Sequence, residues 1–253
     1  MKRQIQVAVV LIVLGGLLTT AAFFMSFYTA SVQRFGTYTA EGHVDTVFDI
    51  APSSEQVAGG VTYGRPWLAQ KIFYFHVPVA LASFLVFTIA AIFAVMFLIK
   101  KKKSYDTRSR LAVETSLIFT LATMITGILW TRASWGVWWE WEPRLTTYFI
   151  LMILMVAYFV LRNSVSDEER RATYAAVFCI IAWIDVPISF MITRLIPSSH
   201  PVVFQPGMDV TNLVPFIAAM IGMLGVGYAV YMLRAAEENA EERLDMIREK
   251  LEA

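Results

Sequence analysis

Residues 72–99 read IFYFHVPVALASFLVFTIAAIFAVMFLI, a run without lysine, arginine, aspartate or glutamate. A helix needs about 20 apolar residues to cross the hydrocarbon core of a bilayer, so this run is long enough to span it. The rest of the chain agrees: 57% of its 253 residues are hydrophobic and only 16% are charged, whereas soluble domains carry about 25% charged residues. The sequence therefore predicts a membrane protein. The net charge of +1 gives no indication of a nucleic-acid partner.

Five further apolar stretches lie on either side of this run. Backbone groups inside hydrocarbon must find their hydrogen bonds within the segment, so helices are expected. We predict an all-α bundle of six transmembrane helices over residues 1–233, followed by a charged cytoplasmic tail helix over residues 234–253. The first stretch follows Lys2 and Arg3 as in a signal peptide, but it is longer than a usual signal core and is expected to be a retained anchor. The five stretches are 5–28, 112–131, 146–162, 173–195 and 213–233.

Lysine and arginine set the orientation of such a bundle, since they are enriched on the cytoplasmic side. Six spans place 15 of the 21 Lys and Arg residues on the side of the termini and six on the other side. Both termini are therefore predicted to be cytoplasmic, with outer loops over residues 29–71, 132–145 and 196–212. All three histidines, His43, His76 and His200, then lie at or near the outer face.

A tryptophan-rich segment lies in the second outer loop. Residues 130–147 read WTRASWGVWWEWEPRLTT, with five of the seven tryptophans within twelve residues. Trp135, Trp138 and Trp139 have i, i+3, i+4 spacing, so a helix would place them on one face, and Pro143 is expected to end that element or begin the next span. An aromatic belt at the membrane interface is the simpler interpretation, but five rings exceed what anchoring needs.

The alternative is a platform for a large flat ligand, because indole faces give broad and rigid contact area. Heme fits this description, and Arg132 and Arg144 flank the rings and are suited to pair with its propionates. Heme iron also needs axial ligands, for which imidazole is common. A lone histidine is more often structural, but His76 and His200 on the same face as the tryptophans favour a ligand pair. His43 lies near Asp45 and Asp49 and is expected to be solvated.

The presentation of the two histidines differs. His76 lies at the outer end of the second span. His200 precedes Pro201, and a residue before proline is biased away from helix, so we expect an extended loop there. The single Cys179 excludes an intrachain disulfide and argues against a zinc–thiolate site.

These residues resemble a known family. WGVWWEWEPRLT at 135–146 is similar to the tryptophan-rich "WWD" signature of heme-handling proteins in cytochrome c biogenesis, and within that superfamily the chain most resembles CcmC. QKIFYFHVP at 70–78 resembles the segment with the first heme histidine, and DVPI at 185–188 followed by HP at 200–201 resembles the second. The CcmF and CcsA families have a similar signature but typically more spans. The resemblance covers nearly the whole chain except the charged tail.

The resemblance implies a role in heme handling rather than catalysis. A CcmC-like protein in the cell's inner membrane binds heme b at the outer face and presents it to the heme chaperone CcmE. The ABC module CcmA–CcmB and the small membrane protein CcmD are the implied partners, together with the lipid bilayer. The implied iron ligands are His76 and His200. The other implied heme contacts are Trp135, Trp138, Trp139, Trp141, Glu142, Arg132 and Arg144.

The sequence departs from that pattern in two places. Glu142 stands where the signature usually has aspartate, and residues 191–199, MITRLIPSS, lack the aromatic pair often found before the second histidine. The geometry around His200 is therefore where we expect differences from the family.

Three alternatives remain open from the residues: a heme or small-solute permease subunit associated with an ABC transporter, a CcsA-like heme delivery protein, and a scaffold without a cofactor. Asp185 is the one charge well inside a span, which argues against a polar transport pathway. It either lines the heme cavity or is hydrated near the interface. In the tail, Ala240, Leu244, Ile247 and Leu251 form one apolar stripe, typical of a solvated amphipathic helix or of a helix that docks on a partner.

Overall fold

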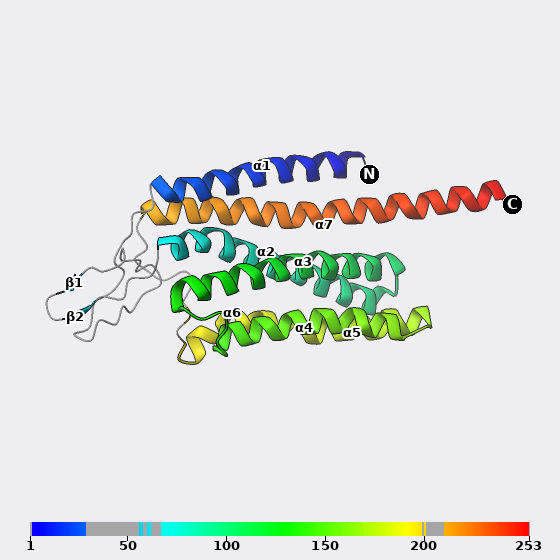
Figure 1. Cartoon of the computed structure of the whole chain (residues 1–253). Helices are drawn as coiled ribbons and strands as arrows, with labels where there is room; N and C mark the ends of the chain where they lie inside the picture. The colour runs from blue at the N-terminus through cyan, green and yellow to red at the C-terminus, as the bar shows by residue number, and fades with distance from the viewer. Residues whose placement is uncertain are drawn as a thin grey trace.

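The computed structural model describes residues 2–28, 56–57, 60–61, 67–198, 200 and 210–252. Within these ranges six helical segments are long and apolar enough to cross a membrane (Figure 1). This confirms the predicted all-α bundle of six spans, and the chain is a multi-pass membrane protein. The segments are α1 (Lys2–Tyr28), α2 (Trp67–Lys100), α3 (Lys103–Trp135), α4 (Pro143–Ser164), α5 (Glu168–Trp183) together with α6 (Asp185–Leu195), and α7 (Val210–Glu252). A short antiparallel pair, β1 (Gln56–Val57) and β2 (Gly60–Val61), precedes α2.

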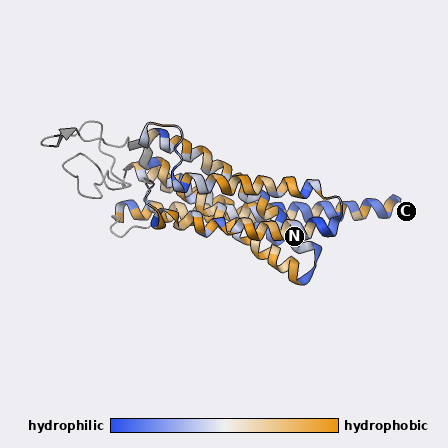
Figure 2. Cartoon of the chain, turned by 90° about the horizontal axis from the view of Figure 1, so that it is seen from below, coloured by the Kyte–Doolittle hydropathy of each residue, from blue (hydrophilic) through white to orange (hydrophobic). Residues whose placement is uncertain are grey.

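Both termini lie at the same end of the bundle, as an even number of crossings requires (Figure 1). We call this the terminal end and the opposite one the distal end. Hydrophobic residues run along the helices, whereas the C-terminal part of α7 is hydrophilic (Figure 2). The predicted tail helix is not a separate element, because α7 continues without a break from the last span to Glu252. The cytoplasmic orientation of the termini stays a prediction.

The main hydrophobic core is shared by α2, α3, α4 and α5. Its fully buried members include Phe87, Leu111, Leu151 and Met155. α1 lies at the side of the bundle against α7, where Gly222 permits a close approach. A Cβ at Gly222 would lie 2.4 Å from Thr19 Oγ1 and 2.6 Å from Gly15 O. Small residues at such contacts let transmembrane helices pack closely.

Ion pairs join the helices at the terminal end. Arg162 of α4 donates to both carboxylate oxygens of Asp106 of α3, at 2.7 and 2.9 Å. α7 is linked to α3 by two further pairs, Arg234 with Glu114 at 3.0 Å and Arg110 with Glu238. At the distal end, α7 is joined to α2 by a hydrogen bond of 3.0 Å from Tyr74 Oη to Asn212 Oδ1.

The tryptophan-rich segment is only partly helical. α3 ends at Trp135 because Gly136 adopts the left-handed conformation, with φ of 77°, which glycine tolerates without steric cost. The chain then runs through residues 136–142 outside any helix. The expectation that Trp135, Trp138 and Trp139 share one helical face is therefore wrong.

Two prolines shape the helices at this end. Pro143 occupies the first turn of α4, and the Glu142 side chain caps that helix, as is common because the proline lacks only an N–H that would be unpaired there. Pro187 has no N–H to donate to the carbonyl of Trp183, and the fifth span breaks at Ile184 between α5 and α6. A proline inside a helical stretch removes a backbone hydrogen bond in this way.

Candidate functional site

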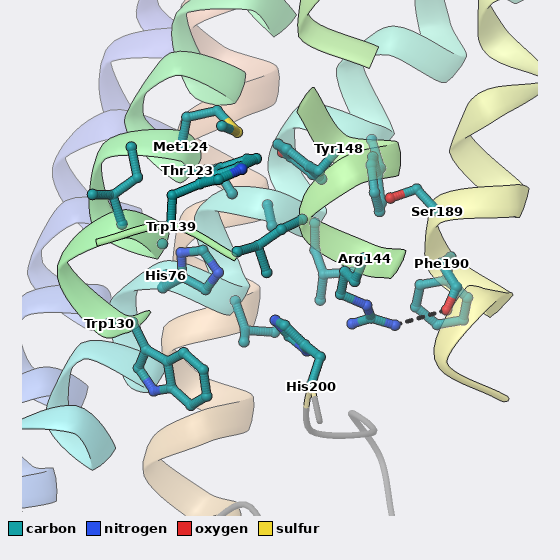
Figure 3. A pocket seen from close by; sticks show the side chains of 17 residues that line it. His76, Thr123, Met124, Trp130, Trp139, Arg144, Tyr148, Ser189, Phe190 and His200 are labelled. Atoms are coloured by element: carbon teal, nitrogen blue, oxygen red, sulfur yellow. Dashed lines mark hydrogen bonds between the residues drawn. The ribbon is translucent and has the colours of Figure 1, made fainter. Parts of the chain in front are cut away.

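A cavity opens at the distal end between α2, α3, α4 and α6 (Figure 3). Its empty volume is about 740 Å³, part of which is open to the surroundings. The lining side chains are His76, Val77, Ala80, Leu81, Phe84, Thr123, Met124, Gly127, Ile128, Trp130, Trp139, Arg144, Leu145, Tyr148, Ser189, Phe190 and His200.

His76 enters the cavity from the third turn of α2 (Figure 3). Its Nδ1 lies 2.9 Å from Thr126 Oγ1, and that hydroxyl also lies 2.8 Å from the carbonyl oxygen of Ala122. Because the threonine proton goes to a backbone carbonyl, the hydroxyl oxygen accepts from Nδ1–H of the histidine. The lone pair then lies on Nε2. An outer partner of this kind fixes the tautomer and orientation of metal-ligating histidines.

Gly127 gives the His76 ring its space. A Cβ at Gly127 would lie 3.0 Å from Cε1 of the ring, a distance at which the imidazole would have to shift. α3 thus contributes two adjacent residues to the placement of His76, the hydroxyl of Thr126 and the absent side chain of Gly127.

His200 reaches the same cavity from the segment after α6 (Figure 3). Its ring lies against two indoles, with centroid distances of 5.7 Å to Trp130 and 6.4 Å to Trp135. Its backbone N–H donates to Ser198 Oγ at 3.0 Å. Residues 196–198 are outside any helix, which agrees with the expected loop presentation. Two histidines far apart in sequence therefore line one cavity.

Arg144 is the cation of the cavity wall. Its Nη2 donates to the carbonyl oxygen of Phe190 at 2.9 Å and to Thr193 Oγ1 at 3.1 Å (Figure 3). Among the residues that the structure describes, Arg144 Nε and Trp139 Nε1 are buried without a hydrogen-bond partner. Buried donors are nearly always paired, so these two fit a ligand that brings acceptor atoms into the cavity.

The remaining wall is mostly apolar and aromatic. It is formed by aliphatic, aromatic and methionine side chains such as Leu81, Phe84, Met124 and Ile128. Tyr148 also lines the cavity, and its hydroxyl shares a hydrogen bond of 2.5 Å with that of Ser83. The donor set, two imidazoles with an arginine on an apolar wall, fits heme as cargo: a flat apolar macrocycle with an iron that binds nitrogen ligands and two carboxylates.

The structure separates the other predicted contacts from the cavity. Trp138 and Trp141 are 59% and 70% exposed, and neither lines it. Trp135 touches His200 but lines no part of the cavity wall. Arg132 donates to the Gly136 carbonyl and lies over the Trp138 ring, 5.5 Å from its centroid.

Glu142 is also outside the cavity, although it is only 5% exposed. Its Oε2 accepts from the backbone N–H groups of Arg144 at 3.0 Å and Leu145 at 3.1 Å. Asp185 is half-buried one turn before Ser189 and does not line the cavity. His43 lies outside the described residues.

Known proteins similar to this chain include members of one family. Its residues 63–250 match the model of the family CcmC, "Heme exporter protein C". The chain is 31% identical over 111 residues to heme exporter protein C of Paracoccus denitrificans, which is 44% of this chain and 46% of that protein. It is 35% identical over 171 residues to a putative ccmC-like mitochondrial protein of cytochrome c biosynthesis in Arabidopsis thaliana, covering 64% and 63%.

A third relative is matched over a longer part. Heme exporter protein C of Haemophilus influenzae is 28% identical over 177 residues, 68% of this chain and 72% of that protein. In the first relatives, by contrast, the chain spans about half the length of the protein that it matches. Because the family model covers most of the chain, including every cavity residue, the chain belongs to the heme exporter protein C (CcmC) family.

Proposed function

We propose that this protein binds heme as cargo in the distal-end cavity, with His76 and His200 as axial ligands of the iron. It presents that heme at the outer face of the cell membrane to a heme chaperone of the CcmE type, for cytochrome c maturation. The observation that carries the proposal is that both histidines line one apolar cavity. They do so beside the half-buried Arg144, whose buried Nε has no partner among the described residues.

Each part of the cargo has a partner in this proposal. The imidazoles supply the nitrogen ligands that heme iron takes, Arg144 pairs with a propionate, and the apolar wall covers the macrocycle. The proposed cargo is heme b, held without a thioether bond to this chain, because the single cysteine, Cys179, is buried in the core away from the cavity. The protein performs no reaction on a metabolite in this scheme.

The outer face is favoured by charge. The cavity lies at the distal end, and the connectors and tail at the terminal end carry the larger share of Lys and Arg, which marks a cytoplasmic side. The family supports an ABC module of the CcmA–CcmB type and a CcmD-like small protein as further partners.

The test is the absorption spectrum of detergent-purified protein during titration with hemin. The wild-type protein should give the spectrum of six-coordinate heme. His76→Ala and His200→Ala should each change that spectrum and weaken binding by at least about tenfold, since even an outer partner of a metal-ligating histidine is worth about 10–100-fold. His43→Ala is the matched control and should behave like wild type. A spectrum unchanged in both variants would refute the ligand assignment.

A further inference from the structure

Glu142 is connected to His200 through one intervening side chain. Its Oε1 accepts a hydrogen bond from Ser198 Oγ, and Ser198 Oγ in turn accepts from the backbone N–H of His200 at 3.0 Å. The roles are consistent, because the serine hydroxyl donates its proton to the carboxylate and offers its lone pair to the amide. The three residues form a short chain from the end of the tryptophan segment to the segment that carries His200.

The same carboxylate also holds the start of α4. Its other oxygen, Oε2, accepts from the N–H groups of Arg144 and Leu145. Hydrogen bonds to a charged acceptor are about twice as strong as neutral ones, and a carboxylate at a helix N-terminus is further favoured by the helix dipole. A single buried group therefore ties α4, which supplies Arg144 to the cavity, to the residues just before His200.

Within the described residues 196–198, few backbone hydrogen bonds hold the segment before His200. α6 ends at Leu195, and residues 196–198 have no helical hydrogen bonds beyond the bond from Ile196 N–H to Ile192 O. The His200 ring packs against Trp130 and Trp135. These contacts hold the ring but do not by themselves fix the position of the His200 backbone along the cavity wall. The bond from the His200 N–H to Ser198 Oγ acts on that backbone directly.

We infer that Glu142, acting through Ser198, is a positioning residue: it holds the His200 backbone where the imidazole can bind the iron of the cargo. This inference rests on the proposed function for the identity of the cargo, whereas the hydrogen-bond chain itself does not depend on any ligand. It also connects the two departures from the family pattern. The longer acidic side chain at 142 and the segment 191–199 without its aromatic pair contact each other.

The competing interpretation is that Glu142 only caps α4. Variants at Ser198 separate the two, because Ser198 touches the carboxylate and not the helix start. Ser198→Ala removes both hydrogen bonds of the hydroxyl, and Ser198→Thr restores a hydroxyl. Glu142→Asp keeps a carboxylate for the cap and shortens its reach by one methylene. Ser164→Ala is the matched control, since that exposed hydroxyl bonds only its own helix at Val160 O.

The first measurement is hydrogen–deuterium exchange of heme-free protein in detergent. Ser198→Ala should speed exchange of peptides that cover the His200 amide by about fivefold, the loss expected from one net hydrogen bond. Exchange at Arg144 and Leu145 should not change. Glu142→Asp should show the same selective effect, and Ser198→Thr should restore the wild-type rate.

The second measurement is hemin titration with the absorption spectrum as readout. Ser198→Ala should weaken binding by about tenfold and reduce the six-coordinate signal, as loss of an outer partner of a ligating histidine does. Ser198→Thr should recover both. Exchange at the His200 amide that stays at the wild-type rate in Ser198→Ala overturns the inference.

Failure of the proposed function looks different from failure of this inference. If His200→Ala alters the heme spectrum while Ser198→Ala changes neither spectrum nor affinity, His200 is a ligand that needs no positioning and the inference is wrong. If His200→Ala itself leaves the spectrum unchanged, the ligand assignment is wrong, and the positioning inference fails with it.

Discussion

Two arginines of α4 have opposite surroundings. Arg162, near the terminal end, is 10% exposed and makes a bidentate pair with Asp106, which is 12% exposed. The guanidinium of Arg144, at the distal end, makes no ion pair within 4 Å in the part of the chain that the structure describes, although the carboxylate of Glu142 accepts from the backbone N–H of the same residue. It is held by a carbonyl and a hydroxyl, and its Nε is left unpaired.

The difference separates a charge that is paired within the protein, Arg162, from one that is available to pair with a ligand, Arg144. A buried cation without a counter-ion is costly, and Arg162 avoids that cost inside the protein. For Arg144, part of this free-energy cost remains until a ligand with a carboxylate enters the cavity. The terminal end of the bundle is thus complete in itself, whereas the distal end has unfilled hydrogen-bonding capacity around its cavity.

The largest effect is expected from breaking the pair at the terminal end. Asp106→Asn leaves the buried charge of Arg162 uncompensated, and removing one partner of such a pair costs about 3–5 kcal/mol. Thermal unfolding of heme-free protein in detergent should show a clear fall in Tm. Glu168→Gln is the control, because the Lys103–Glu168 pair is 73% and 62% exposed and should matter little. A Tm equal to that of the control would show that the Arg162–Asp106 pair does not stabilise the fold.

Arg144→Gln should have the reverse profile. It deletes the charge that awaits a propionate, and a hydrogen bond to a charged group is worth about 1.5–3 kcal/mol, so hemin affinity should fall about 10–100-fold. The Tm of heme-free protein should fall less than in Asp106→Asn, since no internal ion pair is lost. Hemin titration and thermal unfolding of the same preparations test both statements. Wild-type affinity in this variant would show that Arg144 does not meet the cargo.

The smallest effect is expected from removing one unpaired donor of the cavity, the indole N–H of Trp139. Trp139→Phe keeps an aromatic ring on the cavity wall and deletes the indole N–H that has no partner among the described residues. One neutral hydrogen bond is worth about 0.5–1.5 kcal/mol, so we expect roughly two- to tenfold weaker hemin binding. Trp138→Phe, at a 59% exposed position outside the cavity, should leave hemin affinity unchanged. Equal losses in both would mean that the exposed rings also contact heme.

The spans could be predicted from sequence because hydropathy alone marks them. The stretch predicted at 146–162 is α4 at Pro143–Ser164, and the added residues at its start are fixed by the cap of Glu142. Helix ends depend on such local contacts. Gly136 shows this most clearly: its left-handed backbone ends α3 within a spacing that otherwise predicts a helical face.

The site could be predicted only in part. His76, His200, Trp139 and Arg144 stand out in the sequence and line the cavity. Phe190 lies on the cavity wall and Thr126 beside His76, but within apolar stretches they have no distinguishing signal. Their roles come from contacts between spans, such as α3 with α2, that a single sequence does not specify. For the same reason Glu142 was expected against heme, whereas its contacts are with α4 and Ser198.

α7 is long enough to connect the two ends of the bundle (Figure 1). Its 43 residues make a rod of about 65 Å at 1.5 Å per residue, roughly twice the thickness of the hydrocarbon core. Near one end, Asn212 is bonded to Tyr74, two residues from His76 on α2. Further along, Arg234 and Glu238 are ion-paired to α3. The residues of α7 beyond these ion pairs extend past the rest of the bundle (Figure 1).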